Sequence, residues 1–442
     1  MRFSTYAEAL AWLESRVDFE RETPHRHRPP TLAPVSSTLA LLADPHRDYP
    51  SVHITGTNGK GTTTMLTSAL LREAGLRVGT YTSPDLHAVN ERIAINGEPI
   101  DDDTFVELFS RVADVESVSG IALTRFEALT VAALLHFSDE GVDVAVVEVG
   151  LGGTWDATNV IDSDVAVLTN VDLDHTAILG PTVEAIARDK VGIFREDGIA
   201  IVGTGDERVV DIARERAERL GATLWLAGRD VIVERNDLAV GGRRLSVRTP
   251  YARHDDALLG LHGVHQGRNA AVAIAAAEAF LGRGLDDDLV VRVLGSARMP
   301  GRLEVLGHDP MVIVDGAHNP AGLRALVASL AEGFHVAGER RCVMGVLEGR
   351  DIGEMIDPLV EAGATWFYFA APRSPRAVDP EVLAAAARER GVSASVHPSG
   401  AAALAHAREN ARDDDVVIVT GSLYLVGEVR AELLGVEHRH AS

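Results

Sequence analysis

Residues 53–64, HITGTNGKGTTT, place a glycine-rich loop between a short apolar run and a helical pattern. The common phosphate-binding loop is G-x-x-x-x-G-K-[ST], in which the hydroxyl after the lysine reaches Mg²⁺. Here Gly61 follows Lys60, Thr62 carries the next hydroxyl, and the loop is shorter than the consensus. Backbone N–H groups of such a loop approach phosphate at a helix N-terminus. We therefore favour a nucleotide site over a simple helix entry, with metal ligands supplied partly from elsewhere.

The alternation that continues from this loop predicts an α/β fold. Helical patterns at residues 62–75, 102–116 and 126–141 alternate with near-continuous apolar runs at 142–150 and 163–171. Such runs are typical of strands in parallel sheets. The pattern predicts a P-loop-type, doubly wound, mostly parallel sheet.

The pattern changes twice further along the chain. It weakens after Gly198, and residues 230–249 indicate an antiparallel excursion with a Gly-Gly turn. A second run of strands and helices follows SARMPGRLE, which predicts a smaller Rossmann-like α/β domain. We place the domains at 1–297 and 298–442.

Composition excludes several classes of protein. The 442 residues exceed one ordinary core and favour two or three domains. The chain has 42 Lys and Arg against 65 Asp and Glu, a net charge of −23, which argues against a nucleic-acid surface. No apolar run is long enough to span a membrane, and charges interrupt the N-terminus where a signal peptide is apolar. Cys342, the single cysteine, predicts a buried thiol in a reducing compartment. We expect a cytoplasmic protein without membrane or nucleic-acid partners.

Acidic residues end two of the predicted strands. Glu148 ends one apolar run, and Asp172, Asp174 and His175 follow the next. In open α/β sheets, ligands bind beyond the carboxyl ends of the strands. A buried salt bridge for Glu148 and a solvated turn for the Asp-x-Asp-His segment are the alternatives. Their position beside the glycine-rich loop favours Mg²⁺, with Ser83 as a further ligand.

Eight motifs are spread from residue 56 to residue 430, over nearly the whole chain: GTNGKGTT, TSPDLHAVNERI, EVGLGGTWDATNV, LDHTAILG, RDKVGIFR, PGRLE, DGAHNP and TGSLYLVGEVR. Taken together and in this order, they resemble the motifs of the folylpolyglutamate synthase and dihydrofolate synthase family of the Mur ligase superfamily.

The resemblance implies a monomeric ligase that consumes ATP and Mg²⁺ to add L-glutamate to folates. ATP converts a carboxylate into an acyl phosphate, which an amine attacks, and a lysine and Mg²⁺ neutralise the developing charge. The implied ATP contacts are Thr57, Asn58, Gly59, Lys60, Gly61, Thr62, Asn269, Arg302 and Asp315. The implied Mg²⁺ ligands are Ser83, Glu148 and His175.

Three further residues take roles from the same resemblance. Lys190, in RDKVGIFR, matches a lysine that is carbamylated by CO₂, whereas the residues alone indicate an ordinary salt bridge. His318 is placed with Lys60 and Lys190 among the catalytic residues. Ser422 is placed near the glutamate or the phosphate.

The resemblance also implies a dihydropteroate site, and with it a second activity that makes dihydrofolate. Phe126 is equally compatible with core packing on an amphipathic helix. Residues 18–30, DFERETPHRHRPP, depart from the bifunctional pattern. The implied substrate residues are Thr124, Arg125, Phe126, Glu127, Trp155, Asp156 and Ala157.

Two other functions compete with folate ligation. One is a different two-domain Mur-like ligase that acts on another acid. The other is a nucleotide-dependent switch in which ATP only changes the angle between domains. Arg302 and Asp315 in the second domain favour a ligase, because a switch needs no amino-acid pocket.

Overall fold

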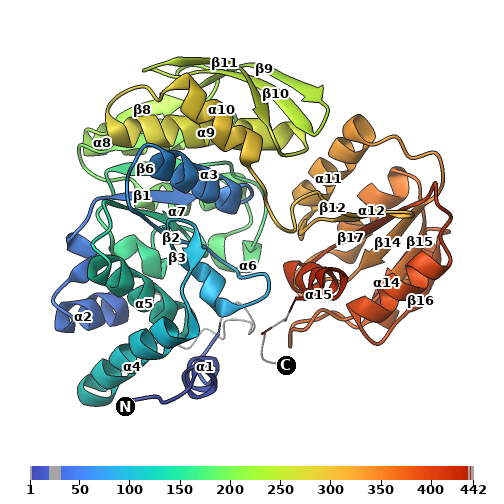
Figure 1. Ribbon diagram of the computed structural model, residues 1–442, viewed down its shortest axis with the longest axis horizontal. Helices are drawn as coiled ribbons and strands as arrows, with labels where there is room; N and C mark the ends of the chain where they lie inside the picture. Colours follow the sequence, from blue (N-terminus) through green and yellow to red (C-terminus); the bar gives the residue numbers. More distant parts are fainter. Residues whose placement is uncertain (1, 19–30, 437–438, 440–442) are drawn as a thin grey trace.

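The computed structural model describes residues 2–18, 31–436 and 439. Figure 1 shows a larger lobe formed by the first two thirds of the chain and a smaller C-terminal lobe beside it. Residues 19–30, which hold most of the segment that departs from the bifunctional pattern, lie outside the described residues.

The larger lobe is built on an eight-stranded sheet in the order β4-β3-β2-β5-β1-β6-β7-β8. β2, β5, β1, β6, β7 and β8 are parallel, and β3 and β4 add an antiparallel edge. The predicted doubly wound, mostly parallel sheet is confirmed. Its strands are β1 (Ser51–Thr55), β2 (Val78–Tyr81), β3 (Ile93–Ile95), β4 (Glu98–Pro99), β5 (Val144–Glu148), β6 (Val165–Leu168), β7 (Ile199–Val202) and β8 (Thr223–Leu226).

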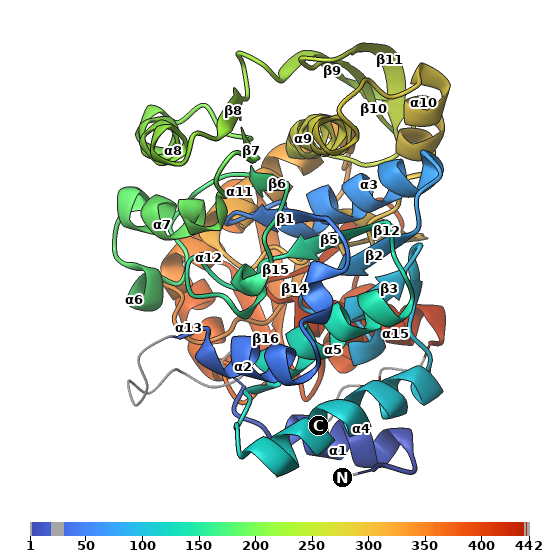
Figure 2. The same ribbon diagram turned by 90° about the vertical axis from the view of Figure 1, so that its left-hand side faces the viewer.

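Helices cover both faces of this sheet, as Figure 2 shows. Side chains of successive strand residues point to opposite faces, so Val146 packs towards α3 and Val147 towards α5. α7 and α8 cover the β6–β8 side. The helices are α1 (Tyr6–Glu14), α2 (Ala33–Leu41), α3 (Lys60–Glu73), α4 (Asp102–Ser119), α5 (Arg125–Asp139), α6 (Thr176–Leu179), α7 (Val183–Lys190) and α8 (Glu207–Leu220), with 3₁₀ turns η1 (Pro45–Arg47), η2 (Val89–Arg92), η3 (Ala157–Val160) and η4 (Val191–Ile193).

The parallel sheet does not weaken after Gly198, contrary to the sequence expectation. β7 and β8 extend it by two further strands. Each has only four residues, and β8 begins with an exposed Thr223 at the sheet edge. Such short runs carry little periodic signal, and pairing with the existing sheet decides their conformation.

The predicted antiparallel excursion is confirmed. β9 (Ile232–Ala239) and β10 (Gly242–Arg248) form a hairpin, and β11 (Arg253–Leu259) pairs with the other edge of β10. α9 (Val264–Leu281) and α10 (Asp287–Ser296) lie between this small sheet and α3, and their apolar residues join one core with those of β1 and β5.

The smaller lobe is a six-stranded sheet in the order β12-β13-β17-β14-β15-β16, parallel except for β12. α11, α12 and α13 cover one face, and α14 and α15 cover the other. Cys342 lies fully buried in β14, as predicted. The elements are β12 (Glu304–His308), β13 (Met311–Val314), β14 (Arg340–Met344), β15 (Ala364–Phe369), β16 (Ser393–Val396), β17 (Val416–Thr420), α11 (Pro320–Gly333), α12 (Ile352–Glu361), α13 (Pro380–Glu389), α14 (Gly400–Glu409) and α15 (Leu423–Leu434).

Within the described ranges, no helix has the length and apolarity that crossing a membrane requires.

Candidate active site

The glycine-rich loop joins the buried strand β1 to α3 through backbone conformations that favour glycine. Gly56 has φ +152° and Gly59 has φ +84°. A Cβ on Gly56 would lie 1.8 Å from Oγ1 of Thr169, and a Cβ on Gly59 would lie 2.5 Å from Oδ1 of Asn269. α3 begins directly after this turn, at Lys60. The loop therefore presents backbone groups at a helix N-terminus, where an anion is stabilised.

Two lysines converge on one carbonyl of this loop. Nζ of Lys60 donates to the carbonyl oxygen of Gly56 at 3.1 Å and to that of Thr57 at 3.2 Å, and Nζ of buried Lys190 donates to Gly56 O at 2.8 Å. Burial, and then the charge of Lys60, lower the pKa of Lys190 to about 7. Lys60 and Lys190 are the only lysines in the 442-residue chain. Every other residue in its total of Lys and Arg is an arginine. The two amines are therefore confined to this site.

Glu148 ends β5 beside the loop and is buried. Its Oε2 accepts a hydrogen bond from the backbone N–H of Ser83 at 3.1 Å. Burial raises the pKa of this carboxyl to about 7, although Lys60 and Arg302 act in the opposite direction. Among the described residues, no ion pair to Glu148 is present. A Cβ on Gly61 would lie 3.6 Å from Oε2 of Glu148, so the missing side chain of Gly61 leaves the space in front of this carboxylate open.

His175 follows β6 in a left-handed conformation with φ +49°. Its Nε2 lies 3.7 Å from Oδ1 of Asp174. Burial lowers the pKa of His175 to about 4, and Lys60 and Arg350 contribute to the decrease. The imidazole is therefore neutral at pH 7 and has a lone pair available for a metal.

Asp174 connects the two lobes. Its Oδ2 accepts from Nδ2 of Asn319 at 3.0 Å, and its carboxylate forms an ion pair with Arg350. Burial raises the pKa of Asp174, but His175, His318 and Arg350 outweigh this effect and hold it below its usual range. A second hydrogen bond of 3.1 Å joins Asn319 to Oδ1 of Asn58 in the glycine-rich loop. The smaller lobe thus contacts the loop directly.

Sequence reasoning missed three residues of this arrangement. Oδ1 of Asn170 accepts from the backbone N–H of Asn58 at 2.9 Å and so holds the loop. Asn319 and Arg350 come from the smaller lobe. Asn319 stands in the quoted DGAHNP motif and was available as a candidate, whereas Arg350 lies in an arginine-rich chain without a local pattern that distinguishes it.

Of the predicted ATP contacts from other elements, Asn269 lies beside the same loop. Nδ2 of Asn269 donates to Gln266 at 3.0 Å, which orients its oxygen near Gly59. The charge of Arg302 opposes the effect of burial, which raises the pKa values of Glu148 and Asp315, and it adds to the decrease in the pKa of His318, so it acts on both lobes.

Asp315 and His318 stand at the end of β13. The carboxylate of Asp315 is buried and accepts from the backbone N–H groups of Leu303 and Ala317, each at 2.8 Å. Nδ1 of His318 lies 2.9 Å from the carbonyl oxygen of Gly316, so Nδ1 carries a proton. Burial lowers the pKa of His318 to about 4, which leaves Nε2 an acceptor at pH 7.

Three of the predicted substrate residues make contacts that stabilise α5. Oγ1 of Thr124 accepts from the N–H of Glu127 at 3.2 Å, and the Glu127 carboxylate accepts from the N–H of Thr124 at 2.7 Å, which is a capping box. Arg125 is buried against Glu14 and Asp18 of the N-terminal segment, at 3.3 and 3.7 Å. Their contact with a substrate stays a prediction.

Four other predicted substrate residues lie near a second loop, after β5, whereas Ser422 lies in the smaller lobe. The ring of Phe126 packs on Gly150, because a Cβ there would lie 2.5 Å from its Cζ. Trp155 is 55% exposed, whereas Asp156 and Ala157 are buried at the start of η3. Ser422 is buried in the smaller lobe and caps α15 through the N–H of Tyr424 at 3.2 Å.

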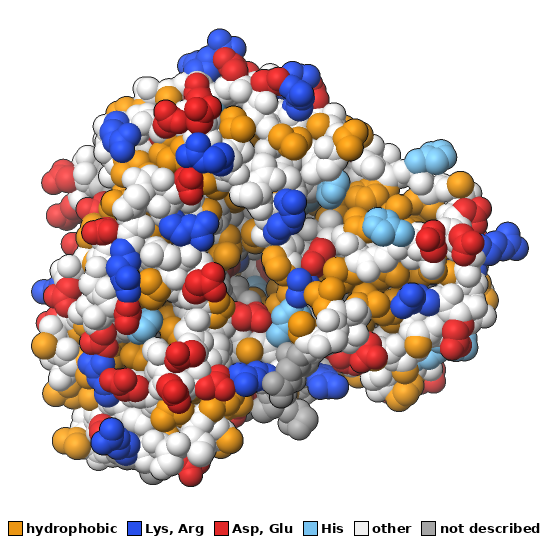
Figure 3. Space-filling model, in the orientation of Figure 1, with side chains coloured by type: hydrophobic (Ala, Val, Ile, Leu, Met, Phe, Trp, Pro, Cys, Tyr) orange, Lys and Arg blue, Asp and Glu red, His pale blue; other side chains and the backbone are white. Residues whose placement is uncertain are grey.

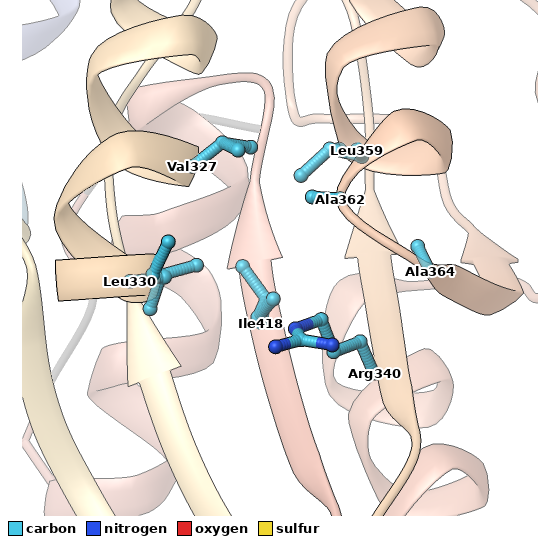
Figure 4. A pocket seen from close by; sticks show the side chains of 8 residues that line it. Val327, Leu330, Arg340, Leu359, Ala362, Ala364 and Ile418 are labelled. Atoms are coloured by element: carbon cyan, nitrogen blue, oxygen red, sulfur yellow. The ribbon is translucent and has the colours of Figure 1, made fainter. Parts of the chain in front are cut away.

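Figure 3 shows a hollow between the lobes, bordered by acidic, basic and histidine side chains. A separate cavity of about 100 Å³ lies between α11 and α12 in the smaller lobe (Figure 4). It is apolar apart from Arg340 and borders the first residues of β14 and β15. This position is at the end of the sheet opposite to Asp315, so the cavity is not part of the site.

Comparisons with known proteins agree with this arrangement. Residues 54–277 match the Mur ligase middle domain, and residues 301–423 match the Mur ligase glutamate ligase domain. The dihydrofolate synthase/folylpolyglutamate synthase of Mycobacterium tuberculosis is 34% identical over 461 residues, which cover 95% of this chain and 91% of the relative. The chain belongs to the folylpolyglutamate synthase/dihydrofolate synthase family. It is therefore an ATP-dependent acid–amino-acid ligase.

Solved structures of this ligase family share the whole fold. A Mycobacterium tuberculosis folylpolyglutamate synthase in complex with ADP superposes with a TM-score of 0.90 at 34% identity, and the match covers 97% of this chain and 98% of that one. An Escherichia coli relative in complex with DHPP and ADP gives a TM-score of 0.86 at 31% identity and covers 98% of both chains.

Proposed function

We propose that this protein adds L-glutamate to reduced folates and to dihydropteroate, in ATP-dependent reactions that pass through an acyl phosphate. The observation that carries the proposal is the convergence of both lobes on one loop. Lys60, Glu148 and His175 approach it from the larger lobe, and Arg302 and Asn319 from the smaller one. Relatives named dihydrofolate synthase/folylpolyglutamate synthase support both acceptors.

In this proposal the chain supplies positioning and positive charge for phosphoryl transfer. Lys60 donates to two loop carbonyls and exchanges them for phosphate oxygens when ATP binds. Arg302 adds positive charge from the smaller lobe, where the acyl phosphate forms. Asn269 and Asp315 complete the ATP contacts, and Ser422 and neutral His318 border the glutamate. The unprotonated Nε2 of His318 accepts a proton from the attacking amine.

The residues around Glu148 fit a magnesium ion. A buried carboxylate without an ion-pair partner in the described part of the chain is costly unless a cation lies against it. The described part of the chain contains no group of three or more His, Cys, Asp or Glu side chains that could hold a metal ion. Mg²⁺ needs no such group, because one or two carboxylates, phosphates and water complete its shell. Glu148, Ser83 and His175 would hold it, and it would neutralise charge on the phosphates.

We propose that Lys190 is carbamylated. CO₂ reacts with the neutral form of an amine, and burial beside Lys60 favours that form of Lys190. The nitrogen bonds the carbon of CO₂ and releases one proton to solvent, so the product is an anion, which would replace repulsion between the two lysines with attraction. The restriction of lysine to positions 60 and 190 supports a need for amine chemistry there, because arginine supplies charge without it.

The remaining parts of the proposal concern the whole protein. We propose a cytoplasmic monomer divided at residue 298 into an ATP-binding domain and a glutamate-ligase domain. The six strands of the third sheet, all of which follow residue 303, support this boundary. The substrates are small molecules, so no membrane or nucleic acid takes part.

The test is ADP release from ATP and L-glutamate with either dihydropteroate or tetrahydrofolate as acceptor. We expect release with both acceptors, and products that are heavier by one glutamyl unit. Lys60→Ala should abolish release while the far-ultraviolet circular dichroism stays that of the wild type. Release that is independent of any acceptor would favour a nucleotide switch, and release with tetrahydrofolate alone would restrict the enzyme to polyglutamylation.

A further inference from the structure

Two buried hydrogen bonds link three polar side chains, from the central strand of the sheet to the second loop of the site. Nε2 of His53, on β1, lies 2.8 Å from Oγ1 of Thr158. That hydroxyl lies 2.5 Å from Oδ1 of Asp156. His53 and Thr158 are fully buried, and Asp156 is 6% exposed. None of the reaction steps proposed above uses His53 or Thr158.

The number of protons on these side chains determines which group donates in each hydrogen bond. A hydroxyl has one proton, so if Thr158 donates it to Asp156, His53 must donate from Nε2. Burial, followed by the charge of Arg195, lowers the pKa of His53 to about 3, so the imidazole is neutral and has a single N–H. Nδ1 of His53 has no hydrogen-bond partner among the described residues. A bare lone pair at Nδ1 is less costly than a buried N–H without a partner.

The opposite direction places a proton on Asp156. Asp156 would then donate to Thr158, Thr158 would donate to Nε2 of His53, and the imidazole proton would move to the unpartnered Nδ1. That state leaves a donor unsatisfied in the core. Burial raises the pKa of Asp156, and the backbone N–H groups of Leu151 and Thr158, at 2.8 and 3.0 Å from the carboxylate, oppose this effect and favour the ionised form.

We propose that Thr158 and His53 are positioning residues that hold Asp156 as an ionised acceptor for the adjacent N–H donors of a pterin ring. This inference rests on the proposed function, because it takes Asp156 as a residue of the pterin site. Thr158 donates twice to Oδ1 of Asp156 and Leu151 donates once to Oδ2, and the backbone N–H of Gly150 also faces the carboxylate. Oδ2 accepts only one of the three side-chain and backbone bonds from Thr158 and Leu151, so it is the oxygen that a pterin N–H fits in charge and in hydrogen-bonding role.

The exposed and apolar surroundings of Asp156 suit a flat heteroaromatic ligand. Trp155, the preceding residue, is 55% exposed. Across the loop, Phe126 packs on Gly150 and lies 6.0 Å from the ring of Tyr81. Aromatic faces beside one fixed carboxylate are the usual composition of a site that orients a ring by a few polar contacts.

The experiment measures KM and kcat for dihydropteroate, tetrahydrofolate and ATP in five variants. Thr158→Val removes the hydroxyl and keeps the shape, and Thr158→Ser restores the hydroxyl. Asp156→Asn tests the pterin site itself. Thr80→Val is the matched control, because the hydroxyl of Thr80 is also buried but donates to Ser68 at 2.9 Å.

We expect Thr158→Val to raise the KM for dihydropteroate about tenfold, as loss of a hydrogen bond to a charged group does. Its kcat and its KM for ATP should stay within about twofold, and Thr158→Ser should recover most of the loss. His53→Phe, which removes the donor to Thr158, should raise the same KM by a smaller factor. Thr80→Val should not change it.

Two results separate failure of this inference from failure of the proposed function. If Asp156→Asn raises the KM for dihydropteroate but Thr158→Val only lowers the melting temperature, the hydroxyl is structural and the inference is wrong. If Asp156→Asn leaves that KM unchanged, or the wild type ignores dihydropteroate, the proposed pterin site is wrong and the inference is overturned with it.

Discussion

At the scale of single residues, Gly61 and Glu148 together indicate where the metal ligand lies. Gly61 stands where a common phosphate-binding loop has its metal-binding hydroxyl, and the space beside it faces the carboxylate of Glu148. Burial raises the pKa of Glu148 to about 7, so a cation nearby would stabilise the ionised form. The metal ligand that this loop lacks is therefore expected at the end of another strand.

Glu148→Gln removes the charge and keeps the shape. We expect it to raise the Mg²⁺ concentration needed for half-maximal ADP release at least about tenfold, or to abolish release, without lowering the melting temperature. The measurement is a Mg²⁺ titration of activity. Gly61→Ser in the same background should not rescue activity, because the deficit is charge at β5. Rescue by Gly61→Ser would place the metal on the loop and contradict this account.

Lys190 has a pKa of about 7, so the neutral amine that reacts with CO₂ dominates above pH 7 and is lost below it. With ¹³C-labelled bicarbonate at pH 8, we expect one carbamate signal in the carbon NMR spectrum. Acidification to pH 6 should remove it, and Lys190→Arg should eliminate it together with most of the activity. Because Lys60 is the only other lysine, the assignment has few alternatives. A fully active Lys190→Arg enzyme would show that only the positive charge matters.

At the scale of secondary structure, a buried histidine holds β11 against two helices. Nε2 of His254 lies 2.9 Å from Glu278 of α9, and its Nδ1 lies 2.6 Å from Asp287 of α10. Glu278 is fully buried and also accepts from the N–H of Leu285 at 2.9 Å. Burial alone lowers the pKa of His254, but the two carboxylates outweigh it and raise the pKa above 6.5.

The contacts of His254 with Glu278 and Asp287 predict that the stability of the protein depends on pH. Because the folded-state pKa of His254 is raised, its contribution is fully present below pH 6.5 and is lost as pH rises through the folded-state value. The free energy of unfolding from urea melts should therefore fall above pH 6.5, and His254→Gln should flatten this part of the curve. His254→Ala, which leaves Glu278 buried and unpaired, should cost roughly 3 kcal/mol. An equally steep pH dependence in His254→Gln would contradict the assignment.

At the scale of the whole molecule, the small antiparallel sheet braces the second lobe. Arg243, buried on β10, donates to both carboxylate oxygens of Glu332 on α11, at 2.7 and 3.1 Å. Its Nε and Nη2 also donate to Oδ1 and to the backbone carbonyl oxygen of Asn236 on the neighbouring strand. Together with the contacts of Asp174 and Asn319, this pair fixes the second lobe at two separate places.

Removing this ion pair should loosen the contact between the two lobes. Glu332→Ala should increase the radius of gyration measured by small-angle X-ray scattering and raise the KM for ATP severalfold, because ATP contacts come from both lobes. Arg243→Ala should have the same effect, and the double variant should add little, as expected for one interaction. Arg244→Ala breaks an exposed pair with Asp256 on the same sheet and should change neither quantity. Additive effects of the two single changes would contradict a direct pair.

The sequence by itself determined the doubly wound pattern, the order of the motifs and the strand ends that carry Lys60, Glu148 and His175. These features are local: apolar runs, glycine-rich turns and the position of a polar residue after a strand are visible without contacts. The tertiary structure decided that Lys60 and Lys190 share one carbonyl and that Asn319 reaches Asn58 across 261 positions of sequence. It also decided that β7 and β8 join the sheet, and that Thr158 links His53 to Asp156. Hydrogen-bond direction, burial and pKa depend on which distant groups meet, and only the packed chain defines those neighbours.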